Sequence, residues 1–357
     1  MTLPLDVAYA PMEAKLVGAL PAGDGWQYEP KWDGFRCLAF KDGDVVDLRS
    51  KAGQPFNRYF PELAEAVGAI GAARAVLDGE IVIPVGDVLS FDDLLMRIHP
   101  AASRVAKLAR DTPALMIVFD LLVDDRGRAL VDEPLATRRA RLEDFMAAHV
   151  PADSPLRLSP VTRDHAAALE WLHGLGSGLD GVIAKRVDAD YRSGERTGME
   201  KYKRMRTADC VVGGFRYAAS GKVLGSLLLG LYDDEGLLNH VGFTSSFKAA
   251  ERAALARKVE PLVGPPGFTG RSPGGPSRWS TERTGEWEPL KDPLVVEVQY
   301  DHFSGGRFRH GTKLIRWRPD KAPRQCTEAQ VAQESASLLG MLESGGASRG
   351  KGTRRSR

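Results

Sequence analysis

One short stretch, Tyr28 to Arg36, constrains the fold of this chain more than any other part of it. The residues that lead into it, Gly25 to Tyr28, favour a β-strand, and Phe35 to Phe40 alternates apolar and small side chains. Asp33-Gly34 between them is a turn signal. We therefore expect a tight strand–turn–strand hairpin with Lys31 at its mouth, where a rigid scaffold could aim the amine as a nucleophile. Taken alone, such residues more often form an ordinary solvated turn.

Two further predicted strands carry carboxylates in their interior. Ala75 to Ile83 contains Asp78 and Glu80, and Leu115 to Val123 contains Asp120. Burying a carboxylate is costly unless it has a partner. Local inconsistencies of this kind tend to mark functional positions.

A carboxylate and a glycine next to an apolar strand occur again in the second half of the chain. Asp180 and a glycine precede an apolar strand that ends at Lys185. Met199 to Lys203 then alternates in character, which places Lys201 and Lys203 on one face of a strand. Carboxylates are the ligands that Mg²⁺ prefers, and lysines hold phosphate, so these strand ends could together form a site for a nucleotide.

Two of these side chains could serve such a site directly. Basic groups near Lys31 would lower the pKa of its amine and supply the neutral form that attacks. Phe119, at the end of a predicted strand, could stack on a nucleobase, although an ordinary core phenylalanine is the commoner use of such a residue.

The chain changes character after Thr207. One helix, Phe247 to Leu262, interrupts a series of short predicted strands. Five short strands and one helix in about a hundred residues favour a small Greek-key barrel of the OB type. The strands are expected at Cys210–Tyr217, Gly225–Tyr232, Leu238–Thr244, Leu294–Tyr300 and Leu314–Arg318. We therefore expect domains at residues 1–206 and 207–325, and a segment 326–357 whose basic tail, from Gly345, is disordered.

Composition supports this organisation without revealing a function. The 357 residues suffice for two or three domains, and 27% charged residues fit a soluble globular protein. Three cysteines, Cys37, Cys210 and Cys326, are too few and too far apart for a disulfide framework or a zinc pattern. We see no secretory signal and no membrane-spanning run, so we expect a cytoplasmic protein.

Net charge is only +2, so the chain as a whole does not indicate a nucleic-acid partner. The local distribution of charge is more informative about such a partner. Two stretches are rich in basic residues, Arg192 to Arg206 and Arg307 to Arg324. Either stretch taken alone is an ordinary solvated loop more often than a binding surface.

Taken in order, these motifs resemble those of the covalent nucleotidyltransferases, the superfamily of ATP-dependent DNA ligases, RNA ligases and mRNA capping enzymes. The resemblance covers nearly all of the chain up to Lys321 and is strongest to the small stand-alone bacterial DNA ligases of the C type. The matching motifs are Lys31-Trp32-Asp33-Gly34-Phe35-Arg36, Arg49–Gly53, Leu77–Glu80, Val118–Asp120, Asp180–Lys185, Lys201–Lys203 and Arg316–Lys321.

This resemblance implies an α+β nucleotidyltransferase domain of antiparallel sheets with flanking helices, followed by an OB-fold barrel. It implies ATP and Mg²⁺ or Mn²⁺ as cofactors and nicked duplex DNA as the partner. Lys31 would attack the α-phosphorus of ATP and carry AMP, which then passes to the 5′-phosphate of the nick before the 3′-OH attacks and releases it. The protein is expected to be a monomer that associates with the nucleoid and serves DNA repair, with repair proteins as possible partners.

The resemblance also assigns roles to individual residues. Glu29, Phe119 and Lys185 would contact the adenine or the nucleotide, and Glu80 would contact the ribose or a metal-bound water. Asp180, with Glu80, would hold the metal. The expected phosphate contacts are Lys201 and Lys203 to the α-phosphate, Arg36 to ATP and to DNA, Arg49 and Lys51 to the nick, and Arg316, Asp320 and Lys321 to the pyrophosphate.

The chain departs from the family pattern at two positions. Asp180 stands where a glutamate is usual, and Met199 stands where a tryptophan is common. An RNA ligase or an mRNA guanylyltransferase remains an alternative, because both share the lysine and the OB domain. An NAD⁺-dependent ligase is disfavoured, because that class has a domain before its lysine and a cysteine zinc module. A non-catalytic OB protein would not need carboxylates inside its strands.

Overall fold

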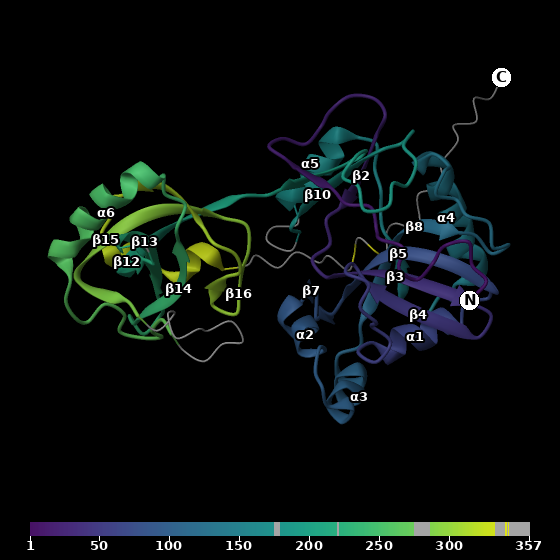
Figure 1. Ribbon diagram of the computed structural model, residues 1–357, viewed down its shortest axis with the longest axis horizontal. Helices are drawn as coiled ribbons and strands as arrows, with labels where there is room; N and C mark the ends of the chain where they lie inside the picture. Colours follow the sequence, from purple (N-terminus) through teal and green to yellow (C-terminus); the bar gives the residue numbers. More distant parts are fainter. Residues whose placement is uncertain (175–178, 220, 275–285, 333–339, 341, 343–357) are drawn as a thin grey trace, which may run out of the picture. The chain divides into compact units, whose positions relative to one another are not determined.

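The computed structural model describes residues 1–174, 179–219, 221–274, 286–332, 340 and 342. The chain divides into two compact units, the first built on Met1–Lys203 and the second on Arg204–Ala332 (Figure 1). Each unit has a hydrophobic core of its own. The basic tail that we expect after Gly345 lies outside the described residues.

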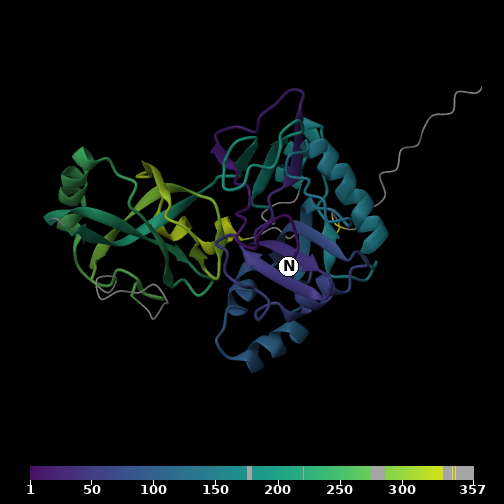
Figure 2. The same ribbon diagram turned by 45° about the vertical axis from the view of Figure 1, so that its right-hand side comes forward.

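A five-stranded sheet lies at the centre of the first unit, in the order β4-β3-β5-β8-β9. Its neighbouring strands are antiparallel, except that β8 and β9 run parallel. Helix α1 (Pro61–Gly68) packs against β4, and helix α4 (Leu135–His149) packs against β8 (Figures 1 and 2). The strands span Phe35–Asp42 (β3), Val45–Ser50 (β4), Arg74–Val82 (β5), Leu115–Val123 (β8) and Leu156–Leu158 (β9).

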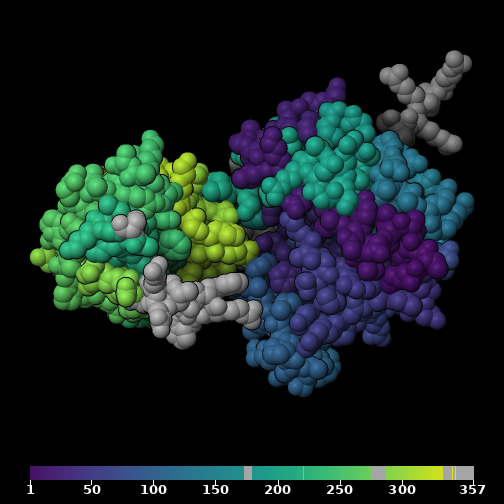
Figure 3. Space-filling model, viewed as in Figure 1, coloured from purple at the N-terminus to yellow at the C-terminus, as the bar shows by residue number. Residues whose placement is uncertain are grey.

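A four-stranded sheet completes the first unit, in the order β1-β11-β10-β2. The N-terminal strand β1 joins it by pairing in parallel with β11. In Figure 3 the N-terminal residues, in purple, lie on the surface of this unit, and some of them border residues in teal. The strands span Lys15–Val17 (β1), Trp26–Pro30 (β2), Gly181–Arg186 (β10) and Met199–Lys203 (β11).

The hairpin that we expected at Lys31 is wrong. β2 pairs with β10 in the four-stranded sheet, whereas β3 pairs with β4 and β5 in the five-stranded sheet. Residues 31–34 therefore carry the chain from one sheet to the other. Gly34 lies so close to β5 that a Cβ there would collide with the carbonyl oxygen of Ile81. The Asp-Gly pair thus marks a close approach of two backbones and not a return of the chain.

The remaining elements of the first unit are short. They are α2 (Phe91–Met96), α3 (Ala102–Asp111), α5 (His165–Gly174) and a small hairpin of β6 (Pro84–Val85) and β7 (Val88–Leu89). Our sequence analysis does not anticipate α3. Val105 is its one buried residue, and most of its other side chains are polar and exposed.

The second unit is the expected OB fold. Its five strands follow the order β14-β13-β12-β15-β18, and a bridge between Thr244 and Thr312 links the two ends of the sheet. Helix α6 (Arg252–Val259) packs against β13 and is shorter than predicted. The strands span Arg206–Ala218 (β12), Gly221–Tyr232 (β13), Leu238–Thr244 (β14), Glu288–Tyr300 (β15) and Lys313–Trp317 (β18), with a hairpin of β16 (Phe303–Ser304) and β17 (Arg307–Phe308).

Two features bear on the expected surroundings of the protein. The cysteines Cys37, Cys210 and Cys326 are all free and buried. Burial raises the pKa of each of their thiols. Among the described residues, no helix has both the length and the apolar character that crossing a membrane requires.

Candidate active site

Lys31 lies where the two sheets of the first unit meet. Its backbone N–H donates to the carbonyl of Gly181, 2.9 Å away, which ties the crossing segment to the start of β10. Its side-chain amine pairs with the carboxylate of Asp180. Lys203 lies 3.9 Å from the same carboxylate. Residues from three separate motifs therefore converge on Asp180.

The expected lowering of the pKa of Lys31 is wrong. Burial acts to lower the pKa of the Lys31 amine, but the carboxylates of Asp180, Asp33 and Glu80 outweigh burial and raise it. The lysine whose pKa is lowered is Lys201, through burial and the nearby charge of Lys31. We expected basic neighbours to dominate, but the carboxylates lie closer to the Lys31 amine.

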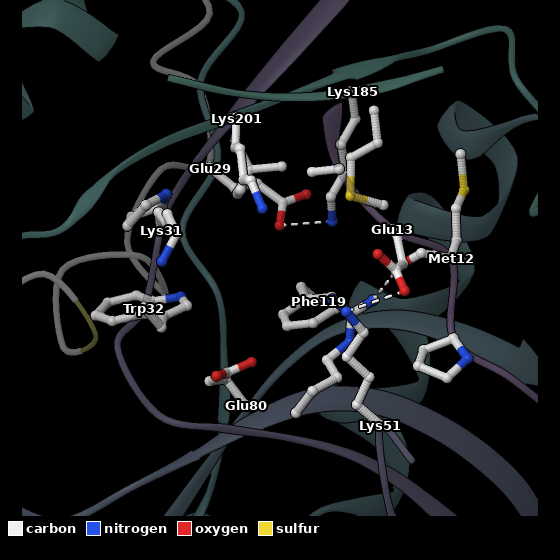
Figure 4. A pocket seen from close by; sticks show the side chains of 16 residues that line it. Met12, Glu13, Glu29, Lys31, Trp32, Lys51, Glu80, Phe119, Lys185 and Lys201 are labelled. Carbon is white, nitrogen blue, oxygen red and sulfur yellow. Dashed lines mark hydrogen bonds and ion pairs between the residues drawn. The ribbon is translucent and has the colours of Figure 1, made fainter. Parts of the chain in front are cut away.

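A cavity of about 250 Å³ opens beside Lys31 (Figure 4). Most of the side chains predicted for nucleotide binding line it, together with several that the sequence analysis does not predict. In Figure 4 the amines of Lys31 and Lys201 and the carboxylate of Glu80 point into this space. The predicted residues are Glu29, Lys31, Arg36, Lys51, Glu80, Phe119, Lys185 and Lys201, and the others include Met12, Glu13, Trp32, Ile183 and Met199.

Glu29 is held by two hydrogen bonds at one end of the cavity. Lys185 Nζ donates to Glu29 Oε2 at 2.8 Å, and Gln27 Nε2 donates to Glu29 Oε1 at 3.0 Å. All three side chains are buried. Gln27 is two residues from Glu29 on β2, so it lies on the same face of the strand. The sequence analysis misses Gln27, although this spacing could have identified it.

Phe119 is in contact with two cations. The guanidinium of Arg36 and the amine of Lys185 each lie 4.5 Å from the centre of its ring. A cation near the face of an aromatic ring is attracted to it. Phe119 is itself buried, and its ring lines the cavity beside these charged groups.

The carboxylates inside the strands fall into two classes. Asp78 accepts from Arg36 Nε and Nη2 at 2.6 and 2.7 Å, and Asp120 accepts from Arg138 at 2.9 and 3.0 Å. Each of these two has a bidentate arginine partner that stabilises it. Glu80 differs, because burial raises its pKa to about 7 against the opposing charges of Arg36 and Lys31. Glu80 is thus the strand carboxylate that remains available to a ligand.

The residues predicted to hold the nick lie at the edge of this site. Lys51 lines the cavity and pairs with Glu13 at 3.0 Å. Arg49 pairs with Asp47 at 2.6 Å and faces a neighbouring groove that Lys51 also lines. The N-terminal segment that carries Glu13 therefore bounds both spaces.

The residues predicted to hold pyrophosphate belong to the second unit. Arg316 pairs with Glu297 at 2.6 Å, and Lys321 pairs with Asp209 at 2.6 Å. Asp320 pairs with Arg318 at 2.8 Å, and Arg318 also pairs with Asp209 at 2.8 Å. They form one network of ion pairs on the barrel. The sequence analysis does not assign a role to Arg318, which the network includes.

Two family models account for most of the chain. The model of the ATP dependent DNA ligase domain matches residues 11–203, and that of the ATP dependent DNA ligase C terminal region matches residues 220–321. The chain therefore belongs to the ATP-dependent DNA ligases. It is an enzyme that uses ATP to seal nicks in duplex DNA. The two family matches favour a DNA ligase over the RNA ligase and the mRNA guanylyltransferase that the sequence analysis left as alternatives.

Within this family the chain is similar to mycobacterial ligases of the C type. DNA ligase C2 of Mycolicibacterium smegmatis is 44% identical over 351 residues, which cover 93% of this chain and 96% of the relative. DNA ligase C of Mycobacterium tuberculosis is 44% identical over 350 residues with the same coverage. A solved structure of a Lig E DNA ligase is 18% identical, with a TM-score of 0.52 over 87% of this chain and 99% of that chain. This last likeness shows the shared fold.

Proposed function

We propose that Lys31 is the residue that carries AMP. The observation that carries this assignment is the position of the Lys31 amine on the cavity wall, with the Glu29–Lys185 pair and Phe119 at one end and Glu80 opposite. The amine attacks the α-phosphorus of ATP, a nitrogen–phosphorus bond forms, and the bond to the pyrophosphate oxygen breaks. The ammonium first loses a proton to water, because only the neutral amine is a nucleophile, and the attacking nitrogen releases a second proton to water as the phosphoramide forms.

One end of the cavity suits the adenine of ATP. The carboxylate of Glu29 accepts hydrogen bonds only, so it can receive one from the exocyclic amine of adenine. Lys185 and Gln27 hold this carboxylate in place. We assign Phe119 to the base, Lys201 and Lys203 to the α-phosphate, and Arg36 to the nucleotide.

A divalent metal fits the carboxylates of Asp180 and Glu80. Both are oxygen donors near Lys31, and Mg²⁺ is commonly held by one or two carboxylates together with substrate phosphates. Among the described residues, no cluster of three or more candidate metal ligands occurs. When bound, the metal would neutralise charge on the transferring phosphoryl group.

The later steps use the same pocket. AMP passes from Lys31 to the 5′-phosphate of the nick, and the 3′-OH then attacks that phosphate as AMP leaves. We assign Lys51 and Arg49 to the strand around the nick, and Arg316, Asp320 and Lys321 to orientation of pyrophosphate in the first step. We infer a monomer that acts in the cytoplasm on nicked chromosomal DNA, as part of repair.

Self-adenylation tests the assignment of the nucleophile. Lys31→Ala should abolish uptake of AMP from ATP and sealing of an unmodified nick, with mass spectrometry reporting the adenylated peptide. Lys107→Ala, at an exposed lysine on α3, is the matched control and should adenylate normally. A stable phosphoramide on the Lys31→Ala protein would refute the assignment.

A further inference from the structure

Arg36 on β3 and Met12 in the segment before β1 both line the nucleotide cavity (Figure 4). Two further side chains, Asp78 on β5 and Tyr191 in the loop after β10, connect them without lining the cavity themselves. All four residues belong to the first unit. We call them the Arg36 network.

Hydrogen bonds join the four members of the Arg36 network in a closed circuit. Arg36 Nη2 donates to Asp78 Oδ2 at 2.7 Å and to the carbonyl oxygen of Met12 at 3.3 Å. The N–H of Met12 donates to the hydroxyl of Tyr191 at 2.9 Å, and this hydroxyl donates to Asp78 Oδ2 at 2.6 Å. A tyrosine hydroxyl can donate and accept at once, so both of its bonds can form together. The guanidinium and the Met12 backbone therefore hold positions that depend on each other.

Tyr191 is held firmly in this circuit. Its side chain is buried, and its backbone N–H donates to the carbonyl of Val131 at 2.7 Å. Burial and the charge of Asp78 raise the pKa of the Tyr191 hydroxyl well above its usual value of 10. The hydroxyl therefore keeps its proton at neutral pH and remains a donor to Asp78.

The segment before β1 lies against the loop that follows β10. Ser193 Oγ donates to the carbonyl of Ala10 at 2.8 Å, and the N–H of Glu13 donates to the carbonyl of Glu195 at 2.8 Å. These bonds flank the contact that the tyrosine makes with the same segment. Pro11 to Ala14 line the cavity. The loop thus supports one wall of the nucleotide site.

Arg36 keeps one nitrogen for a ligand. Its Nε donates to Asp78 Oδ1 at 2.6 Å, its Nη2 is bound as described, and Nη1 has no partner among the described residues. The Arg36 side chain is 20% exposed, whereas that of Asp78 is fully buried. An arginine that is already fixed loses little rotamer freedom when it binds a ligand.

We propose that Tyr191 is a positioning residue, which sets the guanidinium of Arg36 against the nucleotide and holds the Met12 segment as a wall of the cavity. The inference rests on the proposed function, because it takes Arg36 to be a nucleotide contact. Without the hydroxyl, the N–H of Met12 loses its acceptor and Asp78 loses a donor. Arg36 would then keep Asp78 but lose the fixed carbonyl of Met12.

The dependence of self-adenylation on ATP concentration tests this role. Tyr191→Phe should raise the KM for ATP about tenfold and change the rate at saturating ATP by less than about twofold, because Arg36 is assigned to nucleotide binding. Tyr217→Phe is the matched control, since it removes a hydroxyl that donates to Glu260 at 3.1 Å in the second unit, and its KM should not change. A purely structural role would lower the thermal stability and the saturating rate of Tyr191→Phe and leave its KM unchanged. That outcome would overturn the proposal.

An Arg36→Lys variant tests whether Tyr191 acts through Arg36. A lysine cannot form the two-pronged pair with Asp78, so this variant should itself raise the KM. Tyr191→Phe should then add less than about a further twofold in the Arg36→Lys background. Effects that multiply in full would overturn the positioning role alone. An unchanged KM for Arg36→Lys would instead overturn the assignment of Arg36 to the nucleotide, and the inference with it.

Hydrogen exchange tests the wall without any nucleotide. The amide of Met12 should exchange at least about tenfold faster in Tyr191→Phe than in the unaltered protein or in Tyr217→Phe. Peptides from β5 and β8 should keep their protection in all three proteins, which shows that the first unit stays folded. Equal exchange of the Met12 amide in the three proteins would mean that the hydroxyl does not hold this segment and would overturn the proposal.

Discussion

The carboxylate of Asp180 pairs with the amine of Lys31, although 149 positions separate the two residues in the sequence. The pairing of β10 with β2 brings them together, because each residue lies at the end of its strand where the two strands are neighbours. The carboxylate that we assign to the metal is thus also the closest counter-charge of the proposed nucleophile.

Replacement of Asp180 separates these two roles. Asp180→Asn should slow self-adenylation by about 100-fold, because an amide is a poor ligand for a hard cation and metal stabilisation is worth several kcal/mol. Asp180→Glu should stay active, since it keeps the carboxylate. The measurement is the rate of AMP uptake over a range of Mg²⁺ and Mn²⁺ concentrations. Were Asp180 only a counter-charge that restrains Lys31, the Asn variant would adenylate faster than the unaltered protein.

Gln27 offers a test of the adenine end of the cavity. Gln27→Leu removes the hydrogen bond to Glu29 Oε1, and such a bond to a charged group is worth about 1.5–3 kcal/mol. We expect the KM for ATP to rise about tenfold or more, while sealing of a pre-adenylated nick is retained. Gln54→Leu, at an exposed position, is the control. Equal loss in both assays would point to damage of the fold and not of nucleotide binding.

The ion pairs of the second unit lead to a step-specific prediction. Arg316→Ala and Lys321→Ala should impair adenylation by ATP far more than sealing of a pre-adenylated nick, if these residues only orient pyrophosphate. Arg318 remains as a partner for Asp209 in the Lys321 variant, so the barrel should stay folded. Both rates are measured with the same protein preparation. Parallel losses in the two rates would assign the residues to DNA or to the stability of the barrel.

His240 predicts a pH dependence of the stability of the barrel. Its folded-state pKa of about 4 lies below the ordinary value of 6.5, so protonation favours the unfolded state. The free energy of unfolding should be constant above about pH 6.5 and fall towards pH 4, by about 2 kcal/mol at pH 5. Urea titrations at pH 7 and pH 5 measure the fall, and His240→Phe should reduce it. A stability that does not change over this range would mean that His240 is not buried in its neutral form.

Much of the fold follows from the sequence because its signals are local. The segments after Thr207 are short, apolar and strand-like, and the OB barrel that they indicate is confirmed. The hairpin at Lys31 was wrong because a turn signal does not say which strand is the partner. The strand that leads into Lys31, β2, pairs with β10, which is far away in the sequence, and no local pattern reveals this pairing.

The candidate site could be predicted in part for the same reason. The motifs contain most of the charged residues that the cavity brings together, but not the charges that decide the protonation of Lys31. In the sequence, Asp78, Asp120 and Glu80 all look like carboxylates inside apolar strands. In the structure, arginines pair with Asp78 and Asp120, and only these contact distances distinguish the two from Glu80.

The burial of all three native cysteines makes the chain well suited to site-directed labelling. Their thiols are shielded and their pKa values are raised, so they should react slowly with maleimides in the native protein. One new cysteine at an exposed position of each unit, such as Lys107 and Arg257, would therefore give a donor and an acceptor dye with little background. Fluorescence transfer between the dyes would then follow the separation of the two units through ATP binding, nick binding and sealing.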